Sequence, residues 1–157
     1  RVVVGPAATD WVARAAGALR AGFLLLFDYG RERAADPGAR PAGTVTAYRR
    51  HHALHDGWLE RPGEQDLTSH VDPAAVRRAA EAAGLTTLGI VDQTYFLLGL
   101  GLAGRLETGH DRRAIRQRLA AKTLVMPGGL GSTMKAMVFA KNAGMPALKG
   151  LAAGRLT

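Results

Sequence analysis

The segment Phe23-Leu24-Leu25-Leu26-Phe27-Asp28-Tyr29-Gly30 decides the fold. Its first five residues are apolar without alternation, which is typical of a strand buried on both faces and predicts a central strand of a parallel sheet. Asp28 follows this strand directly, at the end where open α/β sheets bind their ligands. The segment therefore predicts both a core strand and a candidate site residue.

The remaining pattern alternates helices with strands, which indicates an α/β sheet. A helix capped by Thr9 or Asp10 comes before the strong strand, and a second helix starts at Asp72-Pro73 and ends at Gly84. Further elements are expected at 2–4, 85–91, 93–102, from 111 and at 134–141. Three clear strands are few for such a sheet, so we expect that upstream strands belong to the same domain.

Two segments carry little periodicity. Residues 31–70 are rich in Gly, Pro, His and charge, and a loop of this length inside a domain is often functional. The Gly- and Ala-rich tail over 142–157 is expected to be mobile. The predicted organisation is therefore one domain over 1–141, with an insertion at about 31–70, and then the tail.

Composition limits the function classes. There is no cysteine, which excludes disulfides and thiolate metal sites, and no apolar run approaches the roughly 20 residues of a membrane helix. The net charge is +8, and only four of the 21 basic residues are lysine. Because the 17 arginines are scattered without interleaved aromatics, nucleic-acid binding is disfavoured. The joint excess of Arg, Ala and Gly is typical of GC-rich bacterial genomes, and we expect a cytoplasmic protein.

An ordered set of short motifs resembles the C-terminal half of the MidA-like methyltransferases, which include the mitochondrial arginine methyltransferase that assists assembly of respiratory complex I. The set covers about residues 20–140 and comprises Gly22, Asp28-Tyr29-Gly30, Gly43-Thr44, Tyr48-x-x-His51, Pro62-Gly63, Asp66-Leu67-Thr68, Val71-Asp72, Gln93-x-x-Phe96-Leu97, Gly131 and Lys135.

The resemblance implies a class I, Rossmann-like methyltransferase fold, of which this chain would be the C-terminal part. In that fold Phe23–Phe27 is the fifth strand, Leu85–Val91 the sixth and Met134–Lys141 an antiparallel seventh. It further implies S-adenosylmethionine as cofactor and a protein arginine, on a respiratory-complex subunit for example, as methyl acceptor. The family's glycine-rich cofactor loop lies upstream of anything here, because Val2-Val3-Val4-Gly5-Pro6 holds one glycine where several are needed. The cofactor-binding residues are therefore unassigned, and the isolated chain is expected to be inactive.

The candidate catalytic residues are Asp28 and His51. Asp28 either faces the substrate or caps the next segment, and His51 with Tyr48 either lines the substrate mouth or ties the insertion down. The remaining candidates for substrate binding are Tyr29, Asp66, Thr68 and Gln93. Asp66 and Thr68 equally suit turns that brace the chain, and Gln93 could hydrogen-bond the insertion.

Other functions remain open from the sequence. His51, His52, His55 and Asp56 have ligand-like spacing only on a helix, and Gly57 argues against one, so we expect no metal site. Two functions compete with catalysis: a non-catalytic assembly scaffold, and a basic module that binds RNA or an acidic protein. The oligomeric state is not indicated.

Overall fold

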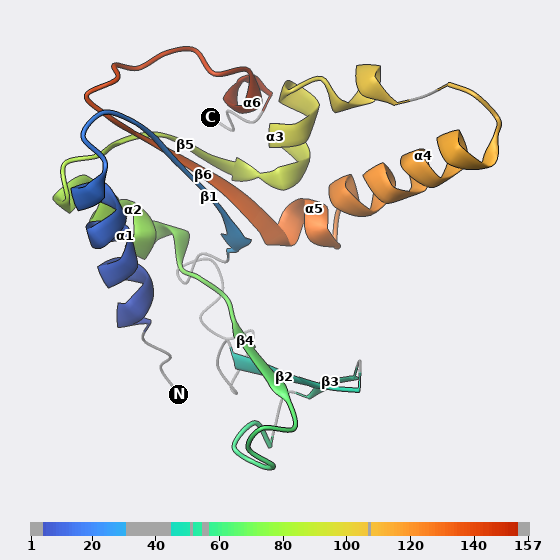
Figure 1. Cartoon of the computed structure of the whole chain (residues 1–157), viewed down its shortest axis with the longest axis horizontal. Coiled ribbons are helices and arrows are strands. Elements are labelled where there is room, and N and C mark those ends of the chain that lie inside the picture. The colour runs from blue at the N-terminus through green and yellow to red at the C-terminus, as the bar shows by residue number, and fades with distance from the viewer. Residues whose placement is uncertain (1–4, 31–44, 51, 55–56, 107, 154–157) are drawn as a thin grey trace.

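The computed structural model describes residues 5–30, 45–50, 52–54, 57–106 and 108–153. Two three-stranded sheets and a set of helices make up this part of the chain (Figure 1). In chain order the elements are α1 (Pro6–Ala18), β1 (Gly22–Tyr29), β2 (Val45–Arg49), β3 (His52–Leu54), β4 (Asp66–Ser69), α2 (Pro73–Ala82), β5 (Thr86–Asp92), α3 (Gln93–Gly99), the 3-10 helix η2 (Leu102–Arg105), α4 (Arg112–Val125), α5 (Leu130–Thr133), β6 (Met134–Lys141) and α6 (Lys149–Ala152).

The main sheet has the order β1-β6-β5, so the last strand of the chain lies between the other two. β6 is antiparallel to both neighbours, which makes β1 and β5 parallel to each other. The antiparallel direction predicted for Met134–Lys141 is confirmed, as is the α/β fold class. β6 is buried from Ala136 to Ala140, because it is paired on both edges and covered on both faces.

The prediction that Phe23–Phe27 is buried on both faces is wrong for this part of the chain. β1 alternates, and the side chains of Phe23, Leu25, Phe27 and Tyr29 are 40–48% exposed. Among the described residues β1 pairs only with β6, and it pairs antiparallel rather than parallel. The uniform apolar composition reflects one face against helices α1 and α2 and a second face that the described residues cover only in part.

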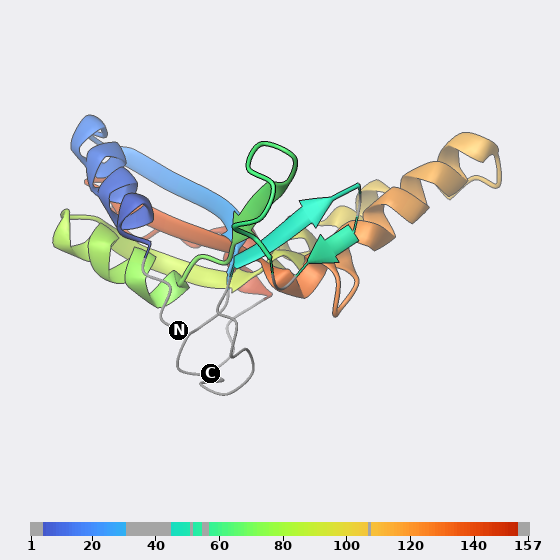
Figure 2. The same cartoon turned by 90° about the horizontal axis from the view of Figure 1, so that it is seen from below.

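Helices cover both faces of the main sheet. α1 and α2 lie side by side on one face (Figures 1 and 2), where Val12 and Val76 pack with Met137 and Phe139 of β6. On the other face, Phe96 of α3 and Leu151 of α6 pack against β5 and β6. The described chain is therefore a helix–sheet–helix arrangement around β6.

The segment 31–70, expected to be a loop, contains the second sheet. Its order is β3-β2-β4 and both pairings are antiparallel. β3 and β4 are short and largely exposed, so the apolar alternation that would have indicated them is absent. A backbone bridge joins Gly30 to Val71, and Val71 N–H donates to the Tyr29 carbonyl over 2.8 Å. The two ends of the insertion thus meet at the end of β1.

Helix boundaries agree with the sequence at α2 and differ at α1. Asp72 Oδ1 accepts a hydrogen bond from Ala74 N–H over 3.0 Å, and Gly84 has a φ of 81°, as predicted for the two ends of α2. At α1 the proposed caps are wrong. The helix begins at Pro6, and the Thr9 hydroxyl, already inside it, donates to the Pro6 carbonyl.

The tail also contains structure. After β6 the chain forms helix α6, in which Gly150 and Leu151 are buried. A Cβ on Gly150 would lie 2.6 Å from the Phe96 ring, so only glycine allows α6 to approach α3 this closely. This packing differs from a freely moving tail, and mobility over 142–157 stays a prediction.

Replacing the cap of α2 should lower stability. Asp72→Ala removes the acceptor for Ala74 N–H, and we expect a loss of about 1 kcal/mol in the free energy of unfolding. Urea denaturation measures it. Asp10→Ala, on the exposed side of α1, deletes the same carboxylate without a cap. If both variants lose the same free energy of unfolding, the cap does not cause the loss in Asp72→Ala.

Candidate functional site

Three charged residues form a row across one end of the main sheet. Asp28 of β1 is the register partner of Lys135 of β6, which is in turn the register partner of Asp92 of β5. Directly opposite residues of antiparallel strands project to the same face, so the three side chains share the face that carries α1 and α2. The row lies at the carboxyl ends of β1 and β5, where α/β sheets bind ligands.

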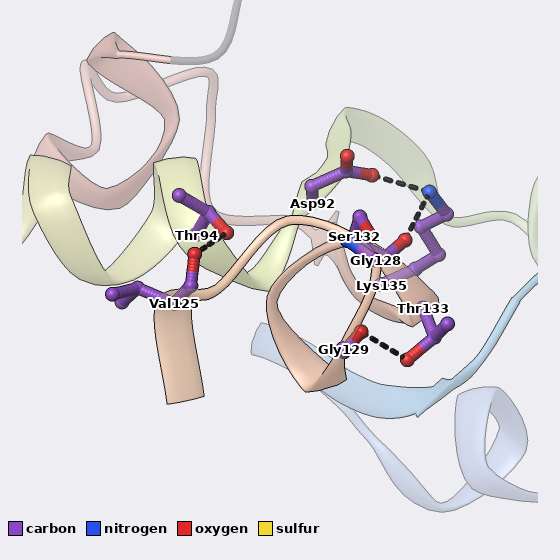
Figure 3. A network of polar contacts seen from close by, with 8 residues as sticks. All are labelled: Asp92, Thr94, Val125, Gly128, Gly129, Ser132, Thr133 and Lys135. Atoms are coloured by element: carbon purple, nitrogen blue, oxygen red, sulfur yellow. Dashed lines mark hydrogen bonds and ion pairs between the residues drawn. The ribbon is translucent and has the colours of Figure 1, made fainter. Parts of the chain in front are cut away.

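Lys135 is the centre of this row. Its ammonium pairs with Asp92 Oδ1 and donates to the Ser132 carbonyl over 3.0 Å (Figure 3). The Lys135 and Asp92 side chains are only 22% and 29% exposed, so solvent screens this pair less than a surface pair. Asp28 Oδ1 instead accepts a hydrogen bond from Tyr29 N–H over 2.7 Å.

Close packing connects the row to the insertion. Gly30 N–H donates to the Thr133 carbonyl over 3.0 Å, and a Cβ on Gly30 would collide with the Lys135 side chain and lie 2.9 Å from Pro73 Cγ. Only glycine therefore allows the chain to leave β1 beside Lys135. The Tyr29 ring meets the His70 ring edge-on, with centroids 6.4 Å apart.

The candidate residues of the insertion lie on the small sheet. Tyr48 and Asp66 are register partners and project from the same face, and Tyr48 is exposed. Thr68 Oγ1 donates to the Thr46 carbonyl over 3.3 Å, which braces β4 against β2. His51 lies outside the described residues.

The Gln93 side chain contacts the end of α4. Its side-chain amide donates to the Leu124 carbonyl over 2.9 Å, and the neighbouring Thr94 hydroxyl donates to the Val125 carbonyl over 2.9 Å (Figure 3). These carbonyls at the end of α4 lack partners within their own helix. Gln93 and Thr94 therefore fix the end of α4 to α3, and the substrate-binding role expected of Gln93 stays a prediction.

The sequence pattern alone did not single out Asp92 and indicated no role for Lys135. Asp92 could have been found by the reasoning used for Asp28, because each is an acid at the end of an apolar strand. Lys135 could not have been found in this way, because its side chain lies between the two acids only when β6 pairs antiparallel between β1 and β5.

In the part of the chain that the structure describes, no group of three or more His, Cys, Asp or Glu side chains could hold a metal ion. His51, His55 and Asp56 lie outside that part, so the absence of a metal site stays a prediction.

No helix among the described residues is long and apolar enough to cross a membrane.

Residues 1–91 match the model of a protein family described as "Putative S-adenosyl-L-methionine-dependent methyltransferase". The chain belongs to this family. No curated protein matches it.

Two crystal structures of COG1565 superfamily proteins from Burkholderia thailandensis are similar to this member of the family. The first is 28% identical, with a TM-score of 0.87 over 96% of this chain and 41% of its own. The second, bound to S-adenosyl-homocysteine, is 28% identical, with a TM-score of 0.84 over 96% of this chain and 40% of its own. The chain thus spans about two fifths of the length of these relatives.

The Lys135–Asp92 pair should stabilise the family fold at this edge. Lys135→Met leaves a half-buried Asp92 carboxylate without its ammonium, and we expect a loss of about 1–3 kcal/mol in the free energy of unfolding. Urea denaturation measures the loss. Lys122→Met, at an exposed position of α4, is the control and should stay within about 0.5 kcal/mol of the unchanged protein. If the two variants behave alike, the pair does not stabilise the sheet.

Proposed function

We propose that this chain is the C-terminal part of an S-adenosylmethionine-dependent methyltransferase that acts on protein arginine. The similarity over 96% of the chain to a protein bound to S-adenosyl-homocysteine carries the catalytic part of the proposal. The MidA-like motifs, from Asp28-Tyr29-Gly30 to Gly131 and Lys135, support the arginine acceptor. A cytoplasmic location and a protein partner belong to the same proposal.

The residues that the structure describes include no glycine-rich cradle for the cofactor between a strand and a helix. A cofactor loop needs several glycines between a strand and a helix, whereas here α1 begins at Pro6, directly after the single Gly5. We therefore assign to this chain only the acceptor side of the site, namely to hold the guanidinium and to take up the proton that it loses.

Asp28 is the residue best suited to that task. The ammonium of Lys135 pairs with Asp92 and not with Asp28, so the Asp28 carboxylate is not committed to that ion pair. A carboxylate can bind a guanidinium through two parallel hydrogen bonds. A guanidinium stays protonated at neutral pH, so its methylation benefits from a proton acceptor close by.

The insertion would supply the mouth of the acceptor site. Its ends meet beside Asp28, through the Gly30–Val71 bridge and the contact of Tyr29 with His70. We assign substrate contacts to Tyr29 and to Tyr48, Asp66 and Thr68 of the small sheet, with His51 as a second proton acceptor. Gln93 is left out because its amide already binds the end of α4.

Cofactor binding tests the catalytic proposal. In calorimetry, the full polypeptide encoded by the gene should bind S-adenosyl-homocysteine, and this chain alone should bind it at least about 100-fold more weakly because the glycine-rich cradle is absent. Turnover by this chain alone would contradict the division of roles. A folded full polypeptide that does not bind would favour the assembly scaffold or, if it binds RNA in a salt-dependent manner, the RNA-binding module.

Removing the Asp28 carboxylate tests the acceptor side. In the full polypeptide, Asp28→Asn should lower kcat for arginine methylation by about 100-fold or more, because a positioned proton acceptor is lost. Binding of S-adenosyl-homocysteine should not change. Asp10→Asn, an exposed carboxylate of α1, is the matched control. An unchanged kcat in Asp28→Asn would remove Asp28 from the site.

A further inference from the structure

Helix α4 has an outward-facing apolar stripe. Its buried residues are Ala114 and Ala121, which lie on one side of the helix. Ile115, Leu119 and Met126 are 42%, 58% and 44% exposed. At about 100° per residue these three fall within about 40° of one another and far from the packed alanines. The described residues therefore leave the stripe partly exposed, and it runs along α4 to the C-cap residue Met126 on a helix that extends away from the main sheet (Figure 2).

Basic residues border the stripe on both sides. Arg112 and Arg116 lie along one side, and Lys122 lies on the other, next to Leu119 and Met126. All three side chains are exposed, and α4 contains no acidic residue. Arg118 is not included among the flanking cations, because its guanidinium already donates to the Gly109 carbonyl.

We propose that α4 is the docking site for an acidic, amphipathic helix of a partner protein. Ile115, Leu119 and the C-cap residue Met126 recur at i, i+4 and i+11, a spacing by which one helix packs along another, and Arg116 and Lys122 flank that seam where charges select the partner. A partner with aliphatic residues on its seam and Glu beside them would bury the stripe and neutralise the flanks. The net charge of +8 adds long-range attraction for such a partner.

Other occupants fit this surface less well. A membrane surface would need more apolar area than three aliphatic side chains, and α4 has no aromatic residue to anchor it. Single-stranded nucleic acid would also need aromatic platforms. A second copy would bring α4 against its own basic flanks, and like charges oppose that pairing. The docking surface is independent of the proposed methyl transfer, so each can fail alone.

Binding of a designed probe tests the surface. The probe is a fluorescent helical peptide with Ile and Leu on its seam and Glu at every flanking position, and its twin carries Lys in place of Glu. By fluorescence anisotropy, the full chain should bind the Glu peptide at least about tenfold more tightly than the Lys peptide, and added salt should reduce the difference.

Charge reversal locates the binding. The double variant Arg116→Glu with Lys122→Glu should bind the Glu peptide about tenfold or more weakly than the unchanged protein does. It should bind the Lys peptide more tightly. Arg77→Glu with Arg78→Glu makes the same change in net charge on exposed positions of α2 and should leave the preference intact. Leu119→Gln should also weaken binding, because the seam loses its most exposed apolar side chain.

Three results would overturn the proposal. They are equal binding of the two peptides, equal loss in the α2 and α4 reversals, and binding of phosphatidylglycerol vesicles or poly-uridine RNA that outcompetes the Glu peptide at α4. Circular dichroism of each variant establishes that the helix is still folded.

Discussion

The burial of β6 is the constraint on which the rest of the structure depends. Its residues from Ala136 to Ala140 are all buried, and Phe139 and Met137 are among the largest fully buried side chains. Burying each of these two side chains stabilises the fold by roughly 1.5–3 kcal/mol. β6 is also the strand that holds β1 and β5 in one sheet, because in the described chain each of them pairs only with β6. These three strands therefore form one sheet only when β6 has been added.

The direction of β6 builds the charged row. Because β6 runs against its neighbours, its first residues lie beside the last residues of β1 and β5, and Lys135 falls between Asp28 and Asp92. Without the lysine, two carboxylates on one face at this edge would repel each other. At this end of the sheet the chain leaves β1 through Gly30, directly beside Lys135, and the two ends of the insertion therefore lie at the row. The candidate site, the ends of the insertion and the buried strand β6 are thus connected by direct contacts.

The proposed docking helix is attached to that arrangement. Gln93 and Thr94 follow Asp92 directly and hold the final carbonyls of α4. A partner bound along α4 would therefore be fixed relative to the strand end that carries Asp92, although it would lie away from the main sheet (Figure 2). Rigid attachment of this kind positions a bound protein more reproducibly than a flexible arm does.

The sequence by itself determined the elements whose signals are local. These are the cap at Asp72, the left-handed Gly84, the strands predicted at 23–27, 85–91 and 134–141, and Asp28 at a strand end, all of which follow from side chains within a few residues of one another. The tertiary structure alone decided the small sheet within 31–70, the antiparallel pairing of β1 with β6, the packing of α6 and the place of Lys135. Each of these depends on contacts between distant segments, and a strand's own residues do not encode which neighbour covers its second face.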